Sequence, residues 1–91
     1  MAKDIRAIHV HMIGGNCPVQ AEGTIDGEPF YFRARGNAWS IGIGGRCPIV
    51  RPDWSCREAY GEDAFAAGWM SEDEARSFIF QAAERYRSNR T

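Results

Sequence analysis

Histidine, tyrosine and arginine side chains alternate along short segments of the sequence, and they are the residue types best suited to binding chemistry. In an extended strand, residues two positions apart point to the same face. Within such strands His9 shares a face with His11, and Tyr31 shares one with Arg33 and Arg35. Arginine binds a carboxylate or phosphate through paired hydrogen bonds, and tyrosine is enriched at binding hot spots. The pattern predicts a binding surface rather than a catalytic centre.

A neighbouring segment adds Gln20 and Glu22 to this expected surface. A two-residue turn at Asp26-Gly27 places Gln20 opposite Arg33, and it places Glu22 opposite Tyr31 and diagonal to Arg33. The predicted partner-binding residues are therefore Tyr31, Arg33, Arg35, Gln20, Glu22, His9 and His11. The alternative interpretation is a solvated face crossed by weak ion pairs, which needs no function.

Three cysteines, Cys17, Cys47 and Cys56, complete the chemically active side chains. With the histidines they supply ligand types for zinc, but the chain has no C-x-x-C pair, so we predict no metal site and no cofactor. Cys56, near the start of an expected helix, is the best candidate for a lowered thiol pKa. No base or orienting group accompanies it, so we predict no catalytic residue and no enzyme. The alternative, a thiol or metal protein, would hold stoichiometric zinc.

The first half of the chain has the pattern of a four-stranded antiparallel meander. Strands are expected over residues 5–12, 18–25, 29–35 and 38–43, separated by turns at Gly14-Gly15, Asp26-Gly27 and Gly36-Asn37. These turns pair Ala21 with Phe32, Phe32 with Ile41, and Ile8 with Ala21. The predicted core face is Ile8, Val10, Met12, Val19, Ala21, Ile25, Phe30, Phe32, Ala34, Trp39, Ile41 and Ile43.

The second half has the pattern of two helices. After a Gly- and Pro-rich connector at residues 44–53, a short helix is expected from about residue 54 to 67, ending at Gly68. Ser71 and Glu74 form a capping box that begins a second helix. Its predicted apolar face is Ala75, Phe78, Ile79, Ala82 and Tyr86. The predicted fold is α+β: a four-stranded antiparallel β-meander followed by two helices packed on one sheet face, with residues 1–91 as a single domain.

Composition narrows the function classes further. Eleven basic and 12 acidic residues give a net charge of −1, which argues against non-specific binding to nucleic acid or membranes. No apolar run approaches the roughly 20 residues of a membrane span, and the first residues do not resemble a signal peptide. An odd number of cysteines favours reduced thiols, so a cytoplasmic protein is expected. Six acids without a base cluster between residues 58 and 74, namely Glu58, Glu62, Asp63, Glu72, Asp73 and Glu74. This acidic helical patch is an alternative docking surface.

Residues 17–36, continued by Trp39-Ser40-Ile41, resemble short phage and prophage proteins of GC-rich bacteria. The segment is similar to small anti-CRISPR proteins directed at type I systems. The resemblance implies a non-enzymatic inhibitor, acting in the cytoplasm of a bacterial host. Such an inhibitor binds protein subunits of a Cascade complex and blocks recognition of target DNA.

Two alternatives stay open at this point. A small module that binds single-stranded RNA or DNA would use the same Tyr and Arg face, and it would bind free oligonucleotides with a steep salt dependence. The inhibitor interpretation predicts little direct nucleic-acid binding. An exposed edge strand at residues 5–12 or 38–43 would permit dimers.

Overall fold

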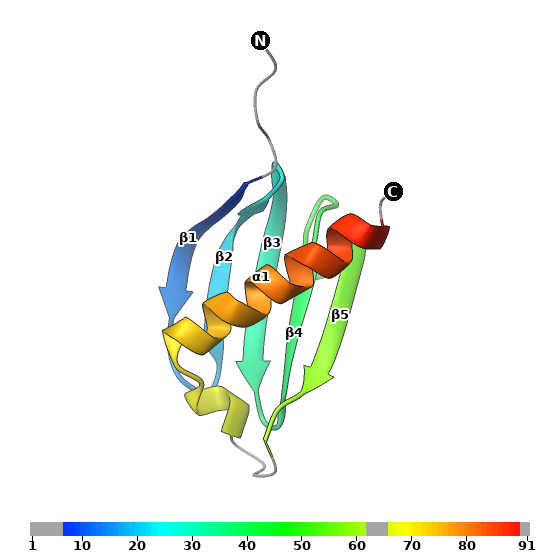
Figure 1. The fold of residues 1–91 in the computed structure, drawn as a ribbon. Helices are drawn as coiled ribbons and strands as arrows, with labels where there is room; N and C mark the ends of the chain where they lie inside the picture. Colours follow the sequence, from blue (N-terminus) through cyan, green and yellow to red (C-terminus); the bar gives the residue numbers. More distant parts are fainter. Residues whose placement is uncertain (1–6, 62–65, 90–91) are drawn as a thin grey trace.

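A five-stranded antiparallel sheet forms one layer of the molecule, and a long helix lies diagonally across one of its faces (Figure 1). The computed structural model describes residues 7–61 and 66–89. Its elements are β1 (Ile8–Gly14), β2 (Val19–Ile25), β3 (Glu28–Arg35), β4 (Ala38–Ile43), β5 (Trp54–Ala59), the 3₁₀ turn η1 (Ala66–Trp69) and α1 (Glu72–Asn89). The α+β class and the antiparallel sheet are confirmed. The predicted count of four strands and two packed helices is wrong in detail, because a fifth strand, Trp54–Ala59, takes the place of the first part of the first expected helix.

The turns between β2, β3 and β4 determine the register of the central sheet. Asp26 (φ 53°) and Gly27 (φ 84°) both have left-handed backbones, as a type I′ hairpin turn requires. This turn pairs Ala21 with Phe32, and the following turn pairs Phe32 with Ile41. Both pairings were predicted and are confirmed.

The predicted register of β1 is wrong. Ile8 pairs with Ile25 rather than Ala21, because residues 15–18 form a wider loop than a two-residue turn. A bulge between Val10 and Met12 then shifts the alternation of side chains. Met12 consequently lies outside the core, with 44% of its surface exposed, and Ile13 packs against the core instead.

The helix expected from residue 54 to 67 is also wrong. Residues 54–59 form β5, which pairs with β4 from Ile43↔Trp54 to Ala38↔Ala59. Residues 62–65 lie outside the described residues, and Gly68 lies in η1 rather than at the end of an α-helix. Pairing with the edge of β4 outweighs the modest helix preference of this segment, since strand preference depends strongly on tertiary context.

The core lies between the sheet and α1. The helix buries Ala75, Ile79, Ala82, Ala83 and Tyr86 against the sheet. The predicted core face of the sheet is confirmed except for Met12, and Ile8 and Val10 on this face are only partly buried. At its centre the Trp39 ring stacks on Phe32 and Phe78, with ring centroids 5.7 and 5.1 Å apart.

Side-chain contacts fix both ends of α1. The predicted capping box is present: the Glu74 backbone N–H donates to Ser71 Oγ at 3.1 Å, and the Ser71 N–H donates to Glu74 Oε1 at 3.4 Å. Near the other end, Arg87 donates two hydrogen bonds of 2.8 Å to Asp26, in the β2–β3 turn. None of the helices in the described residues has the length and apolarity of a membrane span.

Candidate functional site

The sheet face turned away from α1, called the open face here, carries all seven residues predicted to bind a partner. Ladder partners share a face, so the pairs His9↔Thr24, Gln20↔Arg33 and Glu22↔Tyr31 place β1, β2 and β3 residues together. Arg35 follows Arg33 by two positions on β3 and is exposed. His11 lines the same hollow as Glu22 and Tyr31. The sequence pattern therefore predicted which of these residues share a face of the sheet.

An arginine cluster, formed by Arg33, Arg35 and Arg57, is the main electrostatic feature of the open face. The pairs Arg33↔Ser40 and Ser40↔Arg57 put two of the arginines in one row across three strands, about 10 Å apart at the backbone. All three line one hollow of about 380 Å³. The sequence analysis missed Arg57, because it assigned residue 57 to a helix. The alternation of Trp54, Cys56 and Glu58 with Ser55, Arg57 and Ala59 was the signal for a strand.

The arginine cluster has no carboxylate partner in the described part of the chain. Within residues 7–61 and 66–89, none of its three guanidinium groups takes part in an ion pair, and the expected diagonal pair from Glu22 to Arg33 does not form. Arg85 and Arg87, by contrast, bind Glu58 and Asp26. Three neighbouring cations repel one another weakly in solvent, and an anionic group placed between them removes that repulsion. The cluster is suited to binding carboxylates or other oxyanions.

Tyr31 links the arginine cluster to the rest of the open face. Its hydroxyl donates a hydrogen bond of 2.7 Å to Gln20 Oε1, which fixes a half-buried ring in one orientation. Among the described strand residues, Tyr31 is the one Phe, Tyr or Trp on this face, since Phe30 and Phe32 are buried on the other side. A sheet that stacks bases commonly offers two or three such rings.

The connector at residues 44–53 supplies an apolar border to the open face. A Cβ built on Gly42 would lie 2.2 Å from the Pro48 carbonyl oxygen and 3.0 Å from Pro52 Cβ, so the connector packs directly on β4 there. Ile49 is 61% exposed. It lines one hollow of about 320 Å³ with Met12 and another of about 400 Å³ with Arg33 and Arg57. The face therefore combines cationic and apolar groups.

The histidines and thiols do not form a reactive centre in the described part of the chain. The His9 and His11 rings lie near each other, with centroids 6.5 Å apart, and no three His, Cys, Asp or Glu side chains of the described residues could hold a metal ion. Cys56 was expected near the start of a helix, but it lies in the middle of β5. Burial raises the pKa of its thiol, which corrects the expectation of a lowered value.

Several residues of the acidic helical patch have structural partners. Glu58 accepts a hydrogen bond of 2.7 Å from Arg85, and Glu74 accepts one of 2.8 Å from the Tyr60 hydroxyl, which raises the pKa of Tyr60. Glu62 and Asp63 lie outside the described residues. The patch is therefore partly used to hold α1 against β5 and Tyr60, which weakens the case for it as a docking surface.

Fold and surface together define a small α+β protein with an antiparallel sheet, covered on one face and cationic on the other. Comparisons with protein-family models, with curated proteins and with solved structures find no match.

Proposed function

We propose that this chain is a non-enzymatic binding protein whose open face docks on a protein partner. The observation that carries this proposal is the arginine cluster, which has no ion-pair partner among the described residues, on a face that also exposes Met12 and Ile49. Arginine, tyrosine and methionine are enriched in protein interfaces, where cationic groups meet acidic groups of the partner around an apolar centre. Docking would pair the three guanidinium groups with carboxylates and bury the apolar border.

The partner we propose is a protein subunit of a type I Cascade complex, whose recognition of target DNA the bound protein would block. This choice of partner rests on the resemblance of residues 17–36 and 39–41 to small anti-CRISPR proteins. The open face supplies a means of binding without chemistry of its own, as an inhibitor that occupies a surface requires. Because the open face is cationic, the contact we propose is with acidic side chains of a Cascade protein subunit.

The second candidate function is binding of single-stranded RNA or DNA. Tyr31 beside Arg33 and Arg35 favours it, because aromatic rings and guanidinium groups stack on bases and contact phosphates. The single half-buried ring and the apolar border favour a protein partner instead.

The test measures target-DNA binding by purified Cascade in the presence of the wild-type protein and of the triple variant Arg33→Glu, Arg35→Glu, Arg57→Glu. We expect the wild-type protein to block DNA binding. The triple variant should require at least about tenfold more protein for the same effect, because like charges now face the acidic partner. Fluorescence anisotropy with labelled single-stranded oligonucleotides runs in parallel, and we expect no binding at physiological salt.

The control is Arg85→Glu, which makes one Arg-to-Glu exchange on the helical side of the sheet. It should inhibit as the wild type does, and circular dichroism should show that all variants are folded. Full inhibition by the triple variant would exclude the open face as the docking surface. Salt-sensitive oligonucleotide binding without any effect on Cascade would support the nucleic-acid module instead.

A further inference from the structure

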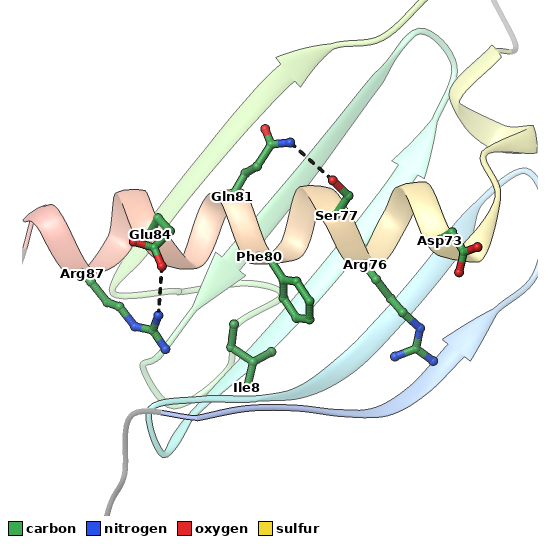
Figure 2. A pocket seen from close by; sticks show the side chains of 8 residues that line it. All are labelled: Ile8, Asp73, Arg76, Ser77, Phe80, Gln81, Glu84 and Arg87. Atoms are coloured by element: carbon green, nitrogen blue, oxygen red, sulfur yellow. Dashed lines mark hydrogen bonds and ion pairs between the residues drawn. The ribbon is translucent and has the colours of Figure 1, made fainter.

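A groove runs along α1 on the opposite side of the sheet from the open face (Figure 2). Its volume is about 850 Å³, and it lies between the helix and the start of β1. The Phe80 ring lies at the centre of α1, points toward Ile8 in this groove and is 49% exposed. The groove has an apolar centre that no described residue covers.

Charged side chains flank Phe80 on both sides along the helix, and those at equal distances before and after it carry opposite charges. Arg76 and Glu84 lie four residues before and after Phe80, and Asp73 and Arg87 lie seven residues before and after it. The two positions at each spacing therefore carry opposite charges. All five side chains line the same groove, because spacings of four and seven residues keep them on one side of a helix.

This order matches a second copy of the same helix laid antiparallel on the first. In such a pair, a two-fold axis at Phe80 relates the two identical antiparallel helices. A residue n positions before Phe80 in one helix then lies opposite the residue n positions after Phe80 in the other helix. Arg76 then faces Glu84 of the other copy, about 6 Å along the helix from the axis, and Asp73 faces Arg87, about 10 Å from it. Every charge at these four positions meets its opposite.

We propose that the α1 groove is a homodimer interface, in which two copies pair their α1 helices antiparallel about Phe80. The two Phe80 rings meet at the two-fold axis, and two Arg76–Glu84 pairs flank them. A two-fold interface uses the same surface on both copies, so that surface must be complementary to itself. The charges of the α1 groove meet this requirement.

The present partners of these groups leave room for the interface. Within the described residues Arg76 takes part in no ion pair, and Glu84, with 77% of its side chain exposed, contacts Arg87 at 3.3 Å. Arg87 is held by Asp26, so its position is fixed before a second copy arrives. The open face lies on the other side of the sheet and stays free, so a dimer would present two docking surfaces.

The experiment is sedimentation velocity of the full chain over a wide range of protein concentration. We expect a species of twice the 10.2 kDa chain mass to form as the concentration rises. Phe80→Glu should abolish it. Arg76→Glu and Glu84→Arg should each raise the dimer dissociation constant at least about tenfold, since each places two like-charged pairs in the interface.

The double variant Arg76→Glu, Glu84→Arg is the decisive measurement, because it exchanges the two charges and restores both pairs. We expect its dissociation constant to return to within about threefold of the wild-type value. Arg33→Glu is the control for charge, since it lies on the open face and should leave dimerisation unchanged. Circular dichroism confirms that each variant is folded.

Three outcomes would overturn the proposal: a monomer at every concentration, a dimer that Phe80→Glu does not weaken, or a double variant as weak as the single ones. None of them affects the docking function, which is tested with Cascade and the arginine cluster. Failure of the open-face test would likewise leave the dimer measurement intact.

Discussion

At the residue scale, two groups of arginines can be distinguished: those that form ion pairs within the chain and those of the arginine cluster, which form none among the described residues. Arg85 and Arg87 bind carboxylates of the same chain, whereas the arginine cluster of the open face binds none within the described residues. Arg87 uses two of its nitrogen atoms on Asp26, in the two-pronged geometry that arginine forms with carboxylates. Its role is therefore to hold the helix to the β2–β3 turn, while the cluster is available to another molecule.

Cys56 gives a prediction at the same scale. Burial raises the pKa of its thiol, so less reactive thiolate is present at a given pH than in the unfolded chain. In the variant Cys17→Ser, Cys47→Ser, we expect alkylation of Cys56 to be slower in the folded protein than in urea, and to rise at higher pH. Iodoacetamide labelling followed by mass spectrometry, over a series of pH values, measures this.

The sign of the linked stability follows from the same pKa. A thiol whose folded-state pKa is raised contributes stability below its unfolded pKa of about 8.5, and that stability is lost as pH rises through the folded value. The wild-type protein should therefore lose stability above about pH 8.5, and Cys56→Ser should remove part of that loss in urea denaturation at a series of pH values. Equal labelling rates in the folded and unfolded chain would contradict the burial argument.

At the scale of elements, the connector owes its position on β4 to Gly42. A Cβ at residue 42 would lie 2.2 Å from the Pro48 carbonyl oxygen, so Gly42→Ala must push the connector away from the open face. We expect this substitution to lower the free energy of unfolding by about 1–3 kcal/mol, as overpacking does. Urea denaturation measures the loss.

The control for Gly42 is Gly14→Ala at the end of β1. A Cβ there would have no neighbour within 4 Å, so its effect should stay within about 0.5 kcal/mol. If the connector also presents Ile49 to a partner, Gly42→Ala should weaken docking on the open face while Gly14→Ala should not. Equal stability of the two variants would show that the connector does not pack on β4.

Sequence reasoning succeeded where a local signal was sufficient. Asp26-Gly27 favours one turn type, so the pairing of Ala21 with Phe32, and with it the face of Tyr31 and Arg33, could be predicted. The periodicity of α1 and its capping box were equally local. These features account for most of the predicted site.

The failures came where distant contacts decide the structure. The bulge before Met12 has no signature in the sequence, and it moves that side chain from the predicted core to the open face. Residues 54–59 contain few strong strand formers, and they become a strand because the edge of β4 pairs with them. Arg57 was therefore missed, although it completes the arginine cluster.

At the scale of the whole molecule, the sheet separates two surfaces with different chemistry. The open face is cationic and proposed to bind a different protein, whereas the α1 groove is self-complementary and proposed to bind a second copy. The aromatic core around Phe32, Trp39 and Phe78 lies between them. Because this core is a single cluster, we expect the chain to unfold cooperatively, as small domains commonly do.

Two phenylalanines distinguish the core from the groove. Phe32 is fully buried, so Phe32→Ala should lower the free energy of unfolding by about 3–5 kcal/mol at every protein concentration, a large share of the 5–15 kcal/mol typical of a domain. Phe80 is half exposed, so Phe80→Ala should change the stability of the monomer by less than about 0.5 kcal/mol.

The effect of Phe80→Ala should grow with concentration, because association stabilises the folded state by mass action and the variant loses that gain. Urea denaturation of both variants and the wild type, at low and at high protein concentration, measures the two effects. A concentration-independent loss at Phe80 would mean that its ring stabilises the monomer by packing on Ile8. A loss that appears only at high concentration would connect the stability of the whole molecule to the pairing of its helices.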